Sequence, residues 1–125
     1  MSVAAMAYIN DLMQSMGIPY AFYQWNEQPP DDYYFVGEYS EIETPTKGEC
    51  GLQEMTFYLR GFTRKSILLL QQAKETIERN ISKTAILDNG SGIAVSYDSA
   101  LIVPTGDAEL KSIKINLNIK EWKVN

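Results

Sequence analysis

The fold is decided by residues 52–81, which read LQEMTFYLRGFTRKSILLLQQAKETIERNI. In the first part of this stretch, Met55, Phe57 and Leu59 alternate with polar or amphipathic residues. Alternation with a period of two, in residues that favour sheets, is typical of a half-buried β-strand. The sequence therefore predicts a strand over 52–62.

From Arg64 to Ile81 the spacing of apolar residues changes to that of an amphipathic helix. Thr63 is predicted to be the N-cap, because its hydroxyl can accept a hydrogen bond from an amide of the first turn. Leu68 and Leu69 are expected to widen the apolar face. A helix that follows a strand so closely must fold back and bury this face, most simply on the sheet.

The rest of the chain predicts one more helix and several strands. The helix is expected over 3–16, with Ser2 as its N-cap and Gly17 ending it in a left-handed conformation. Gly37 indicates either a bulge or close packing of two elements. Strands are expected over 20–25, 33–43, 93–103 with an interruption at 97–99, and 113–124 with a bulge near 120–121, while a short strand over 84–87 stays open.

This order, α-β-β-β-α-β-β, predicts an α+β fold over 1–125, with a mainly antiparallel sheet and two helices packed on one face. The length fits one domain. Thr44 to Gly51 is predicted to be a flexible connection at the tip of a hairpin. No apolar run reaches the roughly 18 residues of a membrane helix, so we expect no membrane partner.

The acidic residues are concentrated in one part of the sequence. Between Glu27 and Glu54 there are eight acidic residues and one basic residue, so this segment carries a net charge of −7. The whole chain has a net charge of −5. The segment is either a solvated loop and strand edge, or an acidic surface that repels nucleic acid or binds a basic partner. Tight binding to DNA phosphates is disfavoured, because the sequence contains no basic cluster.

The sequence offers little catalytic chemistry. It contains no histidine, which removes the commonest general base and all His-containing metal sites. The single cysteine, Cys50, cannot form a disulfide within the chain, and its acidic neighbours make it a poor nucleophile. We therefore expect no enzymatic activity, no catalytic residue, no cofactor and no metal ion.

Contact surfaces are the better candidates for function. Aromatic residues crowd into 20–39, and they either form an interface strip or pack in the core. Tyr33 and Tyr39 are the candidate contact residues of this region. The connection that follows has too little apolar surface to hold itself in place, so a partner would have to order it. Its candidate contact residues are Glu43, Pro45, Lys47 and Glu49.

The whole chain resembles the tail terminator and tail-completion (neck) proteins of long-tailed bacteriophages. The resemblance rests on the helix that closes at 16–19 (MGIP) and on the Pro-Pro loop that leads to 33–38 (YYFVGE). It continues through the hairpin into 55–59 (MTFYL), the helix start at 62–65 (FTRK) and the β-rich end over 113–124.

The resemblance implies a structural protein of the virion tail or neck that assembles in the host cytoplasm. Such subunits form a hexameric ring that caps the tail tube, stops its growth and binds the head-tail connector protein. DNA would pass through the lumen without sequence-specific binding, and acidic walls would keep it from sticking. Alternatives are a head-completion or minor neck protein and, in another class, a small acidic binding module of the immunity or inhibitor type.

Overall fold

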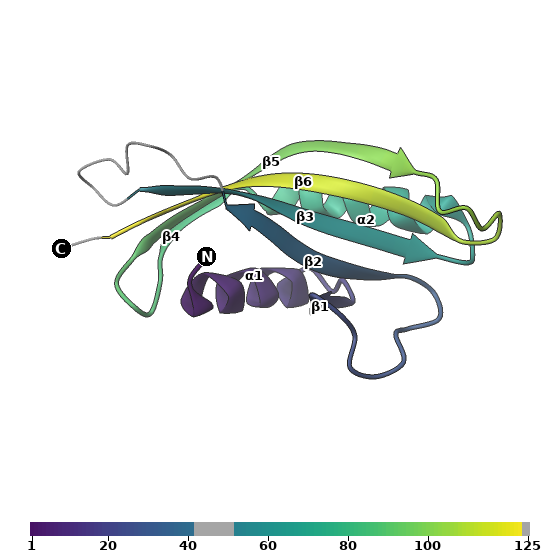
Figure 1. The fold of residues 1–125 in the computed structure, drawn as a ribbon, viewed down its shortest axis with the longest axis horizontal. Helices are drawn as coiled ribbons and strands as arrows, with labels where there is room; N and C mark the ends of the chain where they lie inside the picture. Colours follow the sequence, from purple (N-terminus) through teal and green to yellow (C-terminus); the bar gives the residue numbers. More distant parts are fainter. Residues whose placement is uncertain (42–51, 124–125) are drawn as a thin grey trace.

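The computed structural model describes residues 1–41 and 52–123, which form one six-stranded sheet with two helices on one face (Figure 1). The strand order across the sheet is β1-β2-β3-β6-β5-β4. All neighbouring strands are antiparallel except β1 and β2. The predicted α+β class is therefore confirmed. The elements are α1 (Val3–Ser15), β1 (Tyr20–Phe22), β2 (Tyr34–Glu41), β3 (Gln53–Thr63), α2 (Ile67–Asn80), β4 (Lys83–Ile86), β5 (Gly92–Val103) and β6 (Lys111–Trp122).

The core lies between the sheet and the two helices. The predicted apolar stripe of β6 is fully or almost fully buried, and α2 covers it with Leu70, Ala73 and Ile77. Helix α1 begins at the predicted cap, where Oγ of Ser2 accepts a hydrogen bond from the N–H of Ala5 (3.1 Å). Matched apolar stripes on strand and helix thus place both helices as the sequence predicts.

The predicted start of α2 is wrong. Helix α2 begins at Ile67, and its N-cap is Ser66, whose Oγ accepts from the N–H of Leu68 (3.2 Å). Thr63 instead ends β3; its buried hydroxyl donates to the carbonyl oxygen of Asp32 (2.6 Å) and accepts from the N–H of Lys65 (3.1 Å). Leu68 stands two positions before the buried Leu70, roughly 200° away around the helix, so it does not widen the buried face and is 63% exposed.

The first strand is shorter than predicted. It ends at Phe22, because Tyr23 has a positive φ of 70° and turns the chain away. The N–H of Tyr23 still donates to the carbonyl oxygen of Gly37 (2.7 Å). Gly37 itself lies in an unbroken register with β3, so close packing and not a bulge explains it. A Cβ atom there would overlap the ring of Tyr20 and lie 2.8 Å from Cζ of Phe57.

The bulge predicted near 120–121 is also wrong. The alternation of β6 continues through Trp122, which pairs with Gly92 and covers it on the outer face of the sheet. Glu121 takes the inward position, where it is buried and its Oε1 accepts from the N–H of Ser2 (3.2 Å). A charged residue can occupy that position because it meets the amino end of α1. The irregularity of this region lies in β5, between Tyr97 and Ser99, where the interruption was predicted.

Candidate contact surface

The face of the sheet opposite the helices is the outer face. In one row across it, Val36 pairs with Arg60, Arg60 with Lys114, and Lys114 with Leu101. Among the described residues, no helix lies over this face. Its side chains are partly exposed and mix aromatic, apolar and charged groups, which is the composition of many protein–protein contact surfaces.

Charged and aromatic side chains of the outer face contact one another within the subunit. Nζ of Lys114 lies 4.3 Å from the centre of the Tyr58 ring, which is a cation–π contact. Nη2 of Arg60 lies 3.0 Å from Oε1 of Glu38. The rings of Tyr34 and Phe62 pack at a centroid distance of 5.4 Å. Each cation is held at a fixed place on the sheet while it stays open to solvent.

A hollow of about 510 Å³ opens on the outer face beside the β5–β6 connection. Its lining is mainly apolar and includes Phe62, Leu101 and Val103, with two cationic side chains, Arg60 and Lys114. We call it the outer hollow. A concave apolar site with a few polar groups is the usual form of a binding site for a small molecule or for a side chain of a partner.

A second hollow, of about 500 Å³, lies on the helix side of the same end of the sheet. It is lined by Ile67 of α2, Ile102 of β5, the β5–β6 connection and Lys111. We call it the inner hollow. Both hollows are lined by the β5–β6 connection. Figure 1 shows that this connection lies at the same end of the molecule as the end of β3 and the start of α2.

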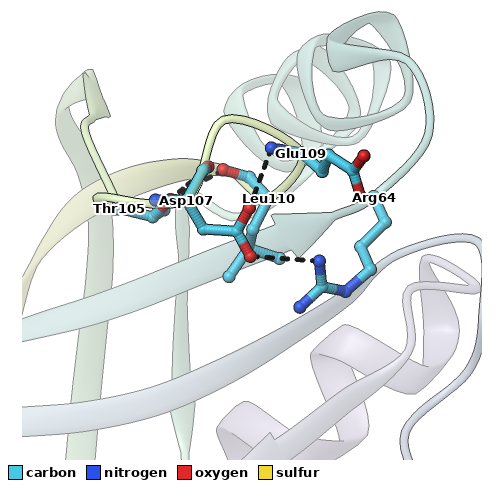
Figure 2. A network of polar contacts seen from close by, with 5 residues as sticks. All are labelled: Arg64, Thr105, Asp107, Glu109 and Leu110. Carbon is cyan, nitrogen blue, oxygen red and sulfur yellow. Dashed lines mark hydrogen bonds and ion pairs between the residues drawn. The ribbon is translucent and has the colours of Figure 1, made fainter.

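The β5–β6 connection is held by a compact polar network (Figure 2). Oγ1 of Thr105 lies within hydrogen-bond distance of the carbonyl oxygens of Leu110 (2.8 Å) and Asp107 (2.9 Å), which share its single proton. The carboxylate of Asp107 accepts from the N–H of Glu109 (3.0 Å) and lies 3.2 Å from Nη1 of Arg64. These contacts, the Glu109 amide first and the Arg64 guanidinium next, lower the pKa of Asp107. The network therefore fixes the shape of both hollows.

The predicted contact residues are distributed differently. Tyr33 is half-buried against Phe35 (centroid distance 6.3 Å, nearly perpendicular rings), and burial together with the charge of Asp32 raises the pKa of its hydroxyl. Tyr39 stacks on Phe22 at 6.0 Å. Both rings thus contribute to packing around β1 and β2. Glu43, Pro45, Lys47 and Glu49, together with Cys50 and the rest of the 44–51 connection, lie outside the described residues.

The residues that sequence reasoning missed are Leu101 and Ile102 of β5. They are 49% and 67% exposed, which is unusual for neighbouring large apolar side chains. The only signal in the sequence is the uncharged run Ala100–Val103 before Pro104. The same run would also be typical of a buried strand. These side chains are exposed because β5 lies near the edge of the sheet, which the sequence does not show.

A scan against protein-family models finds no match, and a search of curated proteins finds none either. Within residues 1–41 and 52–123, no three His, Cys, Asp or Glu side chains are grouped so that they could hold a metal ion. No helix in the described part of the chain is long and apolar enough to cross a membrane. The geometry of the contact surface is therefore what carries the functional argument.

Proposed function

We propose that this chain is a tail terminator or tail-completion subunit of a long-tailed bacteriophage. Copies would form a ring, with six as the expected number, that caps the tail tube protein and binds the head-tail connector protein. The proposal places the protein in the tail or neck of the virion after assembly in the host cytoplasm. Two things support the proposal: the resemblance of the sequence to this family and the contact surface described above.

The observation that carries the proposal is the pair of hollows at one end of the sheet, with Leu101 and Ile102 exposed between them. Contiguous exposed apolar surface with a rim of charges marks a site of protein association. Its position on a sheet, stiffened by the Asp107 network, suits a subunit that must present one fixed surface in an assembly.

The charge of the chain is consistent with a ring that DNA crosses. The charge of −7 between Glu27 and Glu54, in a chain whose net charge is −5, would repel phosphates and let DNA pass without binding. The cations of the outer face are engaged within the subunit, Arg60 with Glu38 and Lys114 with the ring of Tyr58. We therefore expect no sequence-specific contact with DNA.

The proposal is tested by the mass of the free protein and by its effect on tail tubes. Sedimentation velocity over a range of concentrations should show a species of about six times the 14.1 kDa chain mass. Co-expression with the tail tube protein of the same genome should give tubes of bounded length with a ring at one end in electron micrographs. Tubes assembled without this chain are the control and should keep growing.

Two outcomes would contradict the proposal. A chain that stays monomeric or dimeric at all concentrations, and leaves tube growth unchanged, is not a tail terminator. If the same chain then binds a basic protein partner in a salt-dependent manner, the acidic binding module becomes the better interpretation.

A further inference from the structure

The sheet has two edges, and each is covered by a short strand over only part of its length. Strand β1 pairs with Phe35–Gly37 of β2, so Glu38–Glu41 has no neighbouring strand on that side among the described residues. Strand β4 pairs with the first part of β5, up to Val95, so Ser99–Val103 likewise has none within 1–41 and 52–123. Edge strands with free N–H and C=O groups are templates for pairing with another chain.

The free edge of β5 is shaped to receive a strand. Its side chains alternate, so Leu101 lines the outer hollow and Ile102 lines the inner hollow, while Val103 borders both. A strand added beside β5 would extend its own alternating side chains over the same two hollows. In this kind of recognition, main-chain hydrogen bonds supply affinity and the hollows supply specificity.

The free edge of β2 has the direction that such a strand needs. Strands β2, β3, β6 and β5 are successively antiparallel, so β2 and β5 run in opposite directions. A second copy placed beside the first without turning the sheet over would bring its β2 antiparallel to β5. The helix-covered faces of the two copies would then lie on the same side.

Charge disfavours one of the contacts between like edges. On the free edge of β2, Glu38 pairs with Arg60 of its own subunit, and Glu41 pairs with the N-terminal amino group. Beside β5, Lys114 lines the outer hollow and Lys111 the inner one, and neither has an ion-pair partner among the described residues. Pairing two β5 edges would bring these lysines of both copies together, whereas a contact between unlike edges would bring them near the partly exposed carboxylate of Glu38. Charge therefore favours a head-to-tail contact over a contact between two β5 edges.

We propose that the free edge of β5 binds the free edge of β2 from a second copy of this chain, in antiparallel register. In the register that overlaps the whole free β2 edge, Glu38 of the copy faces Val103 and Ser40 faces Leu101. Tyr39 of the copy then lies on the helix side beside Ile102, at the inner hollow. A contact between two different edges repeats from copy to copy and closes into a ring when the rotation fits.

This contact rests on the proposed function, because it is the joint by which the proposed ring would form. The test uses cysteine pairs in a Cys50→Ser background, where no other thiol is present. Ser40→Cys and Leu101→Cys are purified separately, mixed and oxidised. Because opposite residues on one face of an antiparallel pair bring their Cβ atoms close enough for a disulfide, the mixture should give a dimer with one chain of each kind.

The matched control is Ile102→Cys, which is next to Leu101 in sequence but lies on the other face of the sheet. Mixed with Ser40→Cys, it should give no more than about a tenth of that dimer, because adjacent residues of a strand point to opposite faces. A mass tag on one chain distinguishes the mixed dimer from dimers of like chains.

Each other result overturns the proposal in a distinguishable way. Dimers that form equally well from Leu101→Cys alone would show a two-fold pairing of β5 edges. Rings of native mass that form without the Ser40–Leu101 disulfide would refute this contact and leave the proposed function standing. A mixture that stays monomeric, with tubes that remain uncapped, would refute both the contact and the proposed function.

Discussion

Single side chains decide how tightly the first two strands approach the core. Gly37 faces the partly buried ring of Tyr20 and the fully buried ring of Phe57, and an added Cβ would lie less than 3 Å from both rings. We expect Gly37→Ala to lower the free energy of unfolding by about 1–3 kcal/mol, the usual cost of overpacking a filled core. Urea unfolding measures this cost, with Ser40→Ala on the exposed side of the same strand as the control. Equal stability of the two variants would show that the rings move aside.

Asp107 gives the β5–β6 connection a defined dependence on pH. Its pKa is lowered in the folded state by the Glu109 amide and by Arg64. The carboxylate therefore stabilises the fold above its unfolded pKa, near 4, and this contribution is lost as the pH falls through the lower folded pKa. Asp107→Asn should be less stable than the parent at pH 7, and the difference should narrow as the pH falls below about 4. Thermal melting of both proteins between pH 7 and pH 2 checks this, and a gap of the same size at both ends of that range would contradict it.

At the scale of elements, the packing of α2 on β6 holds the sheet together. Ile115 is fully buried in the middle of the β6 stripe. Ile115→Asp would bury a charge without a partner and should cost about 3 kcal/mol or more. Asn118 lies on the partly exposed outer face of the same strand, so Asn118→Asp should change stability by no more than about 0.5 kcal/mol. Differential scanning calorimetry of the pair tests the assignment, which fails if the two variants melt together.

The helices and strands also show how much of the fold could be predicted from the sequence alone. Periodicity is a local property, and it was enough to predict α1, α2, β3 and the buried face of β6. The helix start was missed because Thr63 and Ser66 are both good caps, and only the contact of Thr63 with Asp32 decides between them. A bulge was predicted because the apolar Trp122 and Val124 are out of phase with the buried stripe of β6, but the register continues and Glu121 takes the inward position. Its partner, the Ser2 amide, is 119 residues away in the sequence.

The candidate contact surface could not be predicted from the sequence. Leu101 and Ile102 read as an ordinary apolar strand, and their exposure follows from β4 being too short to cover β5. The two hollows arise where β3, β5, β6 and α2 come together, and no local pattern encodes that meeting. Tyr33 and Tyr39 were predicted as contact residues from composition; each packs against a ring of its own subunit, and their role in a contact stays a prediction.

For the whole molecule, the proposed assembly makes a prediction that separates folding from association. Ile102 is 67% exposed, so Ile102→Asp should change the stability of the isolated subunit by only about 0.5 kcal/mol. In the proposed contact, however, the same carboxylate would enter the inner hollow beside Tyr39 of the neighbouring copy. Desolvating it there should weaken association at least about tenfold, which corresponds to 1.4 kcal/mol. Thermal melting and sedimentation velocity of one sample measure the two effects separately.

Ile86→Asp is the matched control for that prediction. Ile86 is 65% exposed and also lies along the β4–β5 edge of the sheet, but it belongs to β4 and is outside the proposed contact. Its substitution changes hydrophobicity and charge by the same amount, so it should melt and assemble as the parent does. If both variants lose assembly, added negative charge and not the β5 edge is responsible. If Ile102→Asp assembles normally, subunits join through another surface, and the free edges of β2 and β5 stay unpaired in the ring.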